Sequence, residues 1–352
     1  MNSFIKNSAS GNLKEATSGL VNPKLIMMYV ADDSVFESKV AELEELFPGV
    51  PSTGCIAMAY DKTTYEKGVS IIAFTEGVEV VTGVIRDVST SPVKSIPDLE
   101  KNIKGIKPGK DNTVMIDFCT GNDACVLTTI HGLLEQNNVA LMGGTGDAGK
   151  VSCNGKIFED SDAYALVKNL GGKVKVFKEN IYKPMEGFRF IASDTDRTKY
   201  YVGKLNGKSA KAVYSESLGI PESQIKDQTF QNPLGKMIGK DICIISLKDI
   251  EGEGLCCFRQ VNDSDVLTLL KAEDINVVVQ DTLSAIKAEF KKISCVFSVN
   301  CVFRYIYLNG DSSFDHYLGL MSELSGHCGY VGYGEHCNSQ FVNQSMSCVV
   351  FE

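Results

Sequence analysis

One arrangement recurs three times and limits the folds that this chain can adopt. Each copy has an apolar run, a helical pattern, a glycine-containing turn and a second apolar run. The copies are Leu25–Val30, Val35–Phe47, Gly54-Cys55 and Val69–Phe74; Val114–Phe118, Ala124–Asn137, Gly143–Asp147 and Ala163–Val167; and Cys301–Leu308, Ser313–Ser325 and Gly326–Phe351, which ends in a strand from Met346. Three uneven copies are too few for a solenoid. We therefore expect related α/β modules that pack together, with their glycine turns close to one another.

Length, charge and hydropathy exclude several classes of protein. A chain of 352 residues favours two domains, and 43% hydrophobic with 22% charged residues is typical of a soluble globular protein. The net charge of −9 and the lack of a basic run argue against nucleic acid as a partner. No apolar stretch approaches the roughly 18 residues of a membrane helix. The polar N-terminus lacks the apolar core of a signal peptide. We therefore expect a cytoplasmic protein that does not enter a membrane.

The cysteines indicate a reducing compartment. The chain has 12 cysteines, and most lie inside apolar runs, where a buried thiol packs as a small hydrophobe. No CxxC pattern occurs, so we expect no structural zinc site.

Enzymatic activity is a minor alternative. Cys55 follows a glycine between a helix and a strand, where an imidazole or a helix N-terminus could activate its thiol. Gly144–Gly149 matches GxGxxG, but Asn154-Gly155 and the alternation around it favour a hairpin over the helix that a dinucleotide loop requires. We expect a glycine turn that lines a pocket. We expect no enzymatic activity, and a cysteine-dependent activity at Cys55 is the alternative.

The histidines raise a second alternative, which is haem. His327 and His336 flank a tyrosine-rich turn, and each is next to a cysteine; His131 lies in a helical pattern. Imidazole with thiolate is a ligand set for metals and haem. The spacing of these residues matches no known ligand set, so we predict no metal site. Haem ligation by His131, His327 or His336 stays open beside hydrogen bonding at a pocket rim.

The terminal stretch holds the densest group of polar candidates. Tyr333, Gly334 and Glu335 precede Asn343 and Gln344, which begin the last strand. Buried Asn, Gln and Glu side chains need partners. These residues either lock their own loop or hold the amine or carboxylate of a ligand, and the sequence favours neither.

Five motifs in order give the chain a resemblance to a known family. They are Pro23–Val30 with Phe47-Pro48 and Gly54-Cys55; Gly143-Gly144 with Asp147; Asn206-Gly207 with Ala210, Tyr214 and Leu218-Gly219; Asn232–Gly235; and Gly332–Glu335 with Phe341, Asn343-Gln344 and Met346. This set resembles the N-terminal and C-terminal regions of FIST-domain proteins. The chain departs from the family pattern with Ala59-Tyr60 in place of Gly-Glu, Asn232 in place of His and Ser345 in place of Thr.

The resemblance implies a sensory module in intracellular signalling. It implies binding of a small molecule, such as an amino acid or related metabolite, and output to a separate partner such as a kinase, cyclase or chemoreceptor. Some members bind haem and report nitric oxide, and others bind proteins, so a haem-based sensor and an interaction scaffold are the alternatives.

We expect an α/β fold of two domains with mixed sheets and packed helices. The expected divisions are a polar lead-in at residues 1–22, a FIST N-terminal domain at residues 23–207 and a FIST C-terminal domain at residues 208–352. We expect a ligand cleft between the domains, lined by residues of the glycine turns and the terminal stretch. The predicted lining residues are Gly54, Cys55, Gly143, Gly144, Asp147, Tyr333, Gly334, Glu335, Asn343 and Gln344.

Overall fold

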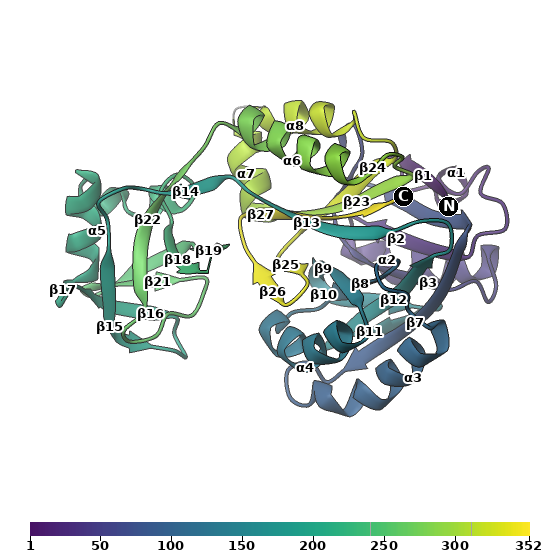
Figure 1. The fold of residues 1–352 in the computed structure, drawn as a ribbon, viewed down its shortest axis with the longest axis horizontal. Helices are drawn as coiled ribbons and strands as arrows, with labels where there is room; N and C mark the ends of the chain where they lie inside the picture. Colours follow the sequence, from purple (N-terminus) through teal and green to yellow (C-terminus); the bar gives the residue numbers. More distant parts are fainter. Residues whose placement is uncertain (240, 311) are drawn as a thin grey trace. The chain divides into compact units, whose positions relative to one another are not determined.

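The computed structural model describes residues 1–239, 241–310 and 312–352. They form two compact units (Figure 1). The larger comprises Met1–Glu179, Val279–Phe341 and Ser345–Glu352, and the smaller comprises Asn180–Val278 and Val342–Gln344. The mixture of helices and mixed sheets in two domains confirms the predicted α/β class. Because the chain leaves the larger unit and returns to it, the units are not successive parts of the sequence.

Each predicted module forms a strand–helix–strand crossover in the larger unit, with its two strands parallel. The crossovers are β2 (Leu25–Val30), α2 (Asp33–Leu46) and β3 (Ser52–Ile56); β8 (Thr113–Cys119), α4 (Asp123–Gln136) and β9 (Val139–Thr145); and β23 (Cys295–Cys301), α7 (Val302–Asn309), α8 (Ser313–Met321) and β24 (His327–Gly332). A further strand pairs antiparallel with the first strand of each crossover: β6 (Val69–Glu76), β12 (Ser161–Asn169) and β27 (Ser345–Phe351).

Each crossover belongs to its own six-stranded sheet, which strands from elsewhere complete. One edge strand is β1 (Asn2–Ser8), β7 (Val78–Arg86) or β13 (Val174–Asn180), beside β6, β12 and β27, respectively. The opposite edge is a strand pair: β10 (Asp147–Cys153) and β11 (Lys156–Phe158) beside β3, β25 (Glu335–Cys337) and β26 (Gln340–Val342) beside β9, and β4 (Ala59–Tyr60) and β5 (Thr64–Tyr65) beside β24. Each of these hairpins follows a different crossover in the chain from the one it completes, so the three sheets exchange hairpins cyclically.

Side chains alternate between the two faces of the first strand of each crossover, and this separates a central core from the outer cores under the helices. Tyr29, Phe118 and Phe297 lie in a core shared by the three sheets, together with Tyr330. The ring centroids of Tyr29 and Tyr330 are 5.2 Å apart, and those of Tyr29 and Phe118 are 5.7 Å apart. On the outer faces, α1 (Leu13–Ala16) and α2 cover the first sheet, and α3 (Ile96–Ile106) and α4 cover the second. A short 3-10 helix, η1 (Pro92–Ser95), precedes α3.

Two local predictions are wrong, each for a physical reason. The predicted strand Cys301–Leu308 is β23 only at Cys301, and the rest forms α7. Arg304 and Leu308 are both buried and lie four residues apart, which is the spacing of one helix face. The predicted turns at Gly54-Cys55 and Gly143-Gly144 lie inside β3 and β9. Glycine is required there because the backbone of a neighbouring strand or hairpin lies too close for a Cβ atom, and not because the chain turns.

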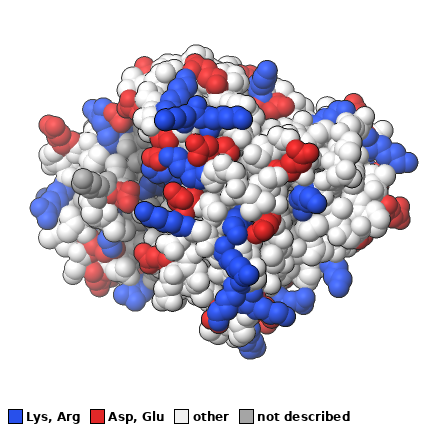
Figure 2. All heavy atoms as spheres, turned by 45° about the vertical axis from the view of Figure 1, so that its right-hand side comes forward, with Lys and Arg blue, Asp and Glu red and all other residues white. Residues whose placement is uncertain are grey.

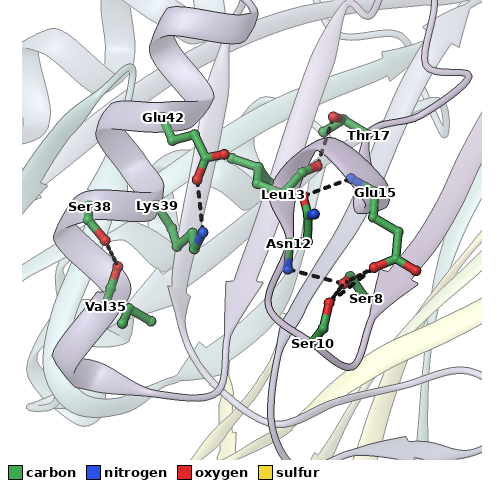
Figure 3. Close-up of polar contacts among 10 residues, drawn as sticks. All are labelled: Ser8, Ser10, Asn12, Leu13, Glu15, Thr17, Val35, Ser38, Lys39 and Glu42. Carbon is green, nitrogen blue, oxygen red and sulfur yellow. Dashed lines mark hydrogen bonds and ion pairs between the residues drawn. The ribbon is translucent and has the colours of Figure 1, made fainter.

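Residues 1–22, expected to be a polar lead-in, contribute β1 and α1 to the larger unit. β1 pairs with β6 along its whole length. The loop to α1 is closed by side chains: Asn12 accepts the amide of Glu15 at 3.2 Å, and the Glu15 carboxylate accepts the hydroxyls of Ser8 and Ser10 at 2.6 and 3.1 Å (Figure 3). This N-cap arrangement fixes the start of a helix too short to be stable alone.

The smaller unit is a nine-stranded sheet arrangement around its own core. Its elements are β14 (Tyr182–Pro184), β15 (Phe190–Asp196), β16 (Tyr201–Leu205), β17 (Lys208–Ser209), α5 (Ala210–Leu218), η2 (Glu222–Gln224), η3 (Lys226–Thr229), β18 (Leu234–Ile238), β19 (Asp241–Ile245), β20 (Leu247–Glu251), β21 (Gly254–Cys257) and β22 (Val266–Ala272). The helix α6 (Ile275–Glu289) spans the junction with the larger unit in the sequence. In the part of the chain that the structure describes, no helix is both long and apolar enough to cross a membrane.

Candidate functional site

The three crossovers carry a glycine at the same point of their second parallel strand. The glycines and the residues opposite them are Gly54 and Met28, Gly143 and Asp117, and Gly329 and Ser298. A Cβ added at these glycines would lie 2.2, 2.2 and 1.9 Å from the backbone oxygen of the residue opposite. No side chain fits at such distances, so each position requires glycine.

The exchanged hairpins supply a residue on the other side of each glycine. Ser152, His336 and Tyr60 lie opposite Gly54, Gly143 and Gly329, respectively. Residues opposite one another in neighbouring strands point to the same face of the sheet. Because the glycine of the second strand has no side chain, the side chain of the hairpin residue can extend across it and reach the residue of the first strand. His336 reaches Asp117, and Tyr60 reaches Ser298. In the first sheet the corresponding residue of the first strand is the apolar Met28. Two of the three equivalent positions are therefore polar.

The second sheet holds what we call the Asp117 cluster: Asp117, Asp123, Thr145, Asp162 and His336. The His336 ring lies between two carboxylates, with Nδ1 2.5 Å from Asp117 Oδ2 and Nε2 2.9 Å from Asp123 Oδ1. The Thr145 hydroxyl also donates to Asp123. His336, Asp117 and Asp162 are fully buried. Both ring nitrogens are occupied, so this imidazole offers no lone pair to a ligand while those bonds persist.

The protonation states of the Asp117 cluster follow from its burial and charges. Burial lowers the pKa of His336, but the two carboxylates outweigh that effect and hold it well above its usual range. For Asp123, burial raises the pKa, but the hydrogen bond and charge of His336 outweigh it and the net shift is downward. Burial and the charge of Asp117 raise the pKa of Asp162 well above its usual range. The cluster therefore contains a protonated imidazole between two carboxylates, beside a neutral Asp162.

Glu335, the residue before His336, faces the opposite side of β25. Its side chain is fully buried, and its Oε2 lies 3.5 Å from the Ser345 hydroxyl. Burial raises its pKa well above the usual range, against smaller opposing hydrogen bonds from Cys301 and Ser345. Its Oε1 has no hydrogen-bond partner among the residues described. One carboxyl oxygen of Glu335 is therefore available for a further hydrogen bond.

The third sheet holds what we call the Arg304 cluster: Tyr60, Glu179, Ser298, Asn300, Arg304, Tyr317 and His327. A chain of hydrogen bonds joins His327 Nε2 to Ser298 Oγ at 2.9 Å and Ser298 Oγ to the Tyr60 hydroxyl at 2.9 Å. Asn300 Nδ2 donates to the hydroxyls of Tyr60 and Tyr317 at 2.7 and 3.2 Å. The chain thus links β24, β23, β4 and α8.

Arg304 and Glu179 form a buried ion pair at the end of this chain. Arg304 Nη2 donates to Glu179 Oε1, and both side chains are at most 1% exposed. The guanidinium carbon lies 5.0 Å from the centre of the Tyr317 ring. Within the described part of the chain, no hydrogen-bond partner exists for Arg304 Nε and Nη1, Glu179 Oε2, Asn300 Oδ1 or His327 Nδ1. Leaving buried groups unpaired costs stability, so these atoms identify the cluster as the strongest candidate for binding.

His327 differs from His336 in its charge as well as in its surroundings. Burial alone lowers the pKa of His327 to about 3, because no carboxylate compensates. The imidazole is therefore neutral at physiological pH. One buried histidine in each of the two polar clusters thus holds the opposite protonation state from the other.

Eight of the ten predicted lining residues do lie near one another, at the carboxyl ends of the second parallel strands. Gly146 packs on Cys55, since a Cβ at Gly146 would lie 2.8 Å from Cys55 Cβ. The Tyr333 amide donates to Thr145 at 2.9 Å, and the Tyr333 hydroxyl donates to Asp147 at 3.2 Å. Gly144 is packed on the backbone of Gly334 in the same way. The converging residues are Gly54, Cys55, Gly143, Gly144, Asp147, Tyr333, Gly334 and Glu335.

The remaining predicted residues lie elsewhere. Asn343 and Gln344 belong to the smaller unit, where Gln344 Nε2 donates to the Thr229 carbonyl at 2.9 Å. His131 is on α4 with 41% of its side chain exposed, and its Nε2 is 3.6 Å from Glu135. Cys55 is fully buried, and burial raises the pKa of its thiol, which is the opposite of what a nucleophilic cysteine requires.

Sequence reasoning missed the charged residues at the centre of both clusters. Asp117 interrupts the apolar run VMIDF, and Arg304 interrupts CVFRYIYL. A single charge inside an otherwise apolar run is rarely buried without a partner or a role. The charged residue within each apolar run was therefore the sequence signal for a buried polar cluster. Tyr60 and Glu179 carried no such signal, because only the exchange of strands between sheets brings them to Ser298 and Arg304.

In the part of the chain that the structure describes, no group of three or more His, Cys, Asp or Glu side chains is arranged to hold a metal ion. The family model of the FIST N domain matches residues 24–208, and that of the FIST C domain matches residues 210–338. No curated protein matches the sequence. Together the two matched segments cover most of the chain.

Proposed function

Because the chain belongs to the FIST family, we propose that it is a sensory protein that binds a small polar metabolite and signals to a separate partner. FIST domains are associated with sensory signal transduction. The ligand we favour is an amino acid or a related metabolite. We propose that it binds at the Arg304 cluster, that the protein acts in the cytoplasm, and that the partner is a kinase, a cyclase or a chemoreceptor.

The unpaired atoms around the Arg304–Glu179 ion pair carry this proposal. Arg304 has two nitrogens without partners among the described residues, and arginine donors suit a carboxylate. Glu179 Oε2 and Asn300 Oδ1 are unpaired acceptors in the same cluster, and an ammonium group donates to such oxygens. A molecule that carries both a carboxylate and an ammonium group would satisfy donors and acceptors together.

Burial connects binding at this cluster to a signal. Arg304 and Asn300 are fully buried, and Glu179 is nearly so. A ligand can therefore enter only if elements that carry these residues move, such as α7 or the end of β13. A ligand that binds only the opened arrangement shifts the population toward it, and that shift is what a partner can detect.

The test is ligand-dependent thermal stability across a panel of amino acids. A ligand at about 100 times its Kd stabilises a protein by about 2.7 kcal/mol, which raises Tm measurably. Arg304→Lys keeps a charge beside Glu179 but lacks the planar set of donors, so it should bind the same ligand more weakly. Arg86→Lys, on the exposed surface of β7, is the matched control and should bind as the wild type does. Equal binding by Arg304→Lys, or no response to any amino acid, would contradict the proposal.

Haem-based sensing is the second hypothesis, and we favour His131 as its ligand. Both ring nitrogens of His336 contact carboxylates, and His327 is buried with its Nε2 hydrogen-bonded to Ser298. His131 is the predicted haem ligand whose imidazole is substantially exposed. Protein purified after haem supplementation should show no Soret band under our leading proposal. A stoichiometric Soret band that disappears in His131→Ala would replace that proposal.

An interaction scaffold is the third hypothesis, and one exposed patch in the smaller unit favours it. Ile191 and Val266 are neighbours across β15 and β22 and are 54% and 41% exposed. Met237 and Ile238 of β18 are 45% and 57% exposed. A scaffold would bind its partner through this patch without a metabolite. Partner binding that is lost in Ile191→Glu and indifferent to every amino acid would favour this reading.

A further inference from the structure

The hydrogen-bond chain of the Arg304 cluster joins two side chains that each keep one unpaired atom. Asn300 Oδ1 and His327 Nδ1 have no hydrogen-bond partner among the residues that the structure describes. The Tyr60 hydroxyl lies 2.7 Å from Asn300 Nδ2 and 2.9 Å from Ser298 Oγ. Ser298 Oγ in turn lies 2.9 Å from His327 Nε2. Each distance is that of a hydrogen bond, so the chain runs without a break from Asn300 to His327.

The direction of the first hydrogen bond fixes the direction of the others, because a hydroxyl has only one proton to donate. Asn300 Nδ2 donates to the Tyr60 hydroxyl, and the Tyr60 proton is therefore donated to Ser298. The Ser298 proton then goes to His327 Nε2, since the Cys328 carbonyl, at 3.5 Å from Ser298 Oγ, lies outside the usual range for such a bond. The imidazole of His327 is neutral, so its one ring proton is on Nδ1.

The same atomic positions also allow the opposite direction. With the Asn300 amide turned over, Oδ1 would accept from Tyr60, and Tyr60 would accept from Ser298. Ser298 would accept from His327 Nε2, and Nδ1 would have no proton. The orientation of the amide and the tautomer of the ring therefore change together. Only the first direction leaves Asn300 with an unpaired acceptor, because the second places its NH₂ group at the same point.

Burial isolates this chain from the charges of the surface. Acidic and basic side chains are spread over the face of the molecule that Figure 2 shows, where water and salt screen them. Tyr60, Ser298 and Asn300 are at most 1% exposed, and His327 is 6% exposed. Hydrogen bonds in such surroundings are strong and polarise one another. The direction of the chain therefore responds to Arg304 and to a ligand beside it more than to surface charge.

We propose that Asn300 and His327 are the coupled ends of one chain, so that Asn300 can bind the ammonium group of the ligand only while His327 carries its proton on Nδ1. Asn300 is then the residue that determines specificity for the ammonium group, and Tyr60 and Ser298 are positioning residues that hold its amide. The coupling is reciprocal, because an ammonium group on Asn300 Oδ1 also fixes the tautomer of His327. The inference rests on the metabolite site proposed above for its ligand, whereas the coupling is a property of the protein alone.

Nitrogen NMR of the full-length chain with isotope-labelled histidine tests the coupling without a ligand. Long-range proton–nitrogen correlations distinguish an imidazole protonated on Nδ1 from one protonated on Nε2, and His327→Gln identifies the signals of His327. The wild type should show the Nδ1-protonated form. In Tyr60→Phe no hydroxyl donates to Ser298, so His327 should change to the Nε2-protonated form that a neutral imidazole favours when unconstrained. Ser298→Ala removes the next member of the chain and should cause the same change.

The matched control is Tyr317→Phe. The Tyr317 hydroxyl also accepts from Asn300 Nδ2, at 3.2 Å, but it does not lie on the path to His327. This variant should keep His327 protonated on Nδ1. An Nε2-protonated His327 in the wild type would overturn the inference. So would one tautomer shared by the wild type, Tyr60→Phe and Ser298→Ala.

A second arm measures the preference of the site for an ammonium group. Affinity is compared between the most stabilising amino acid of the thermal panel and its analogue without the amino group. Tyr60→Phe should reduce the preference for the amino acid about fivefold, the effect of losing one hydrogen bond, and Tyr317→Phe should retain it. An unchanged preference in Tyr60→Phe would contradict the role of Asn300. If the tautomers change as expected but no amino acid binds, the ammonium specificity fails together with the proposed function, whereas unchanged tautomers refute the coupling alone.

Discussion

The Asp117 and Arg304 clusters occupy equivalent places in two related sheets, yet their cations are held in opposite ways. His336 is enclosed, with a carboxylate on each ring nitrogen. Arg304 uses one nitrogen on Glu179, and its Nε and Nη1 have no partner in the described part of the chain. The backbone frame is the same, with a glycine between a first-strand residue and a hairpin residue. The comparison therefore separates a cation whose two ring nitrogens are both paired from a cation with donors left over, while Asp117 Oδ1 and both carboxyl oxygens of Asp162 also lack partners among the described residues.

The largest expected effect on the free energy of unfolding comes from removing the charge of Arg304. Arg304→Met leaves Glu179 buried without its partner, which should lower the free energy of unfolding by about 3–5 kcal/mol. The double variant Arg304→Met/Glu179→Leu removes both charges and should recover most of that loss. Urea unfolding measures both, with Arg86→Met as the surface control. If the double variant were as unstable as the single one, the ion pair would not be the reason.

A smaller effect tests whether the shared frame depends on its glycines. Gly143→Ala and Gly329→Ala place a Cβ within 2.2 Å of a backbone oxygen, so the strands must separate. We expect each to lose about 1–3 kcal/mol of unfolding free energy, the usual range for overpacking. Gly105→Ala, in an α3 position with open space around it, should instead gain roughly 0.5–1 kcal/mol. Unfolding midpoints of all three variants decide the matter, and equal losses would refute the explanation.

The smallest expected effect is a difference between His327 and His336 in how each makes the free energy of unfolding depend on pH. His327 has a folded pKa of about 3, below its unfolded value, so the unfolded state takes up a proton first as the pH falls. Stability should drop by about 2 kcal/mol from pH 6.5 to 5, and His327→Gln should abolish that drop.

The folded pKa of His336 is raised, so its contribution is complete below about pH 6.5 and is lost as the pH rises through the folded value. His336→Gln should therefore flatten the alkaline side of the stability profile and leave the acid side unchanged. Asp162 and Glu335, whose raised pKa values act in the same direction, remain in that variant. Urea unfolding at several pH values gives both slopes, and a matching response of the two variants would show that the clusters do not differ in charge.

The sequence was sufficient for the fold class and the three modules, because apolar periodicity and helix length are local signals. It was also sufficient to group the glycine segments with Tyr333 and Glu335. It misread Cys301–Leu308 as a strand, since an apolar run with one charge suits a strand or a buried helix equally. It could not pair Tyr60 with Ser298, or Glu179 with Arg304. Those contacts span 238 and 125 residues and depend on which sheet each hairpin joins.

The cyclic exchange of hairpins also determines how this chain can be made. The second sheet lacks β25 and β26 until the C-terminal segment is synthesised. The third sheet takes β4 and β5 beside β24, and β13 beside β27, from the N-terminal segment. The first sheet is complete within residues 2–158, but neither the second nor the third sheet can be completed from residues 24–208 or 210–338 alone, although each range matches its own family model. The segments that evolution treats as separate sequence units are interlocked during folding. Nearly the whole chain must be synthesised before the central core, to which all three sheets contribute, is complete.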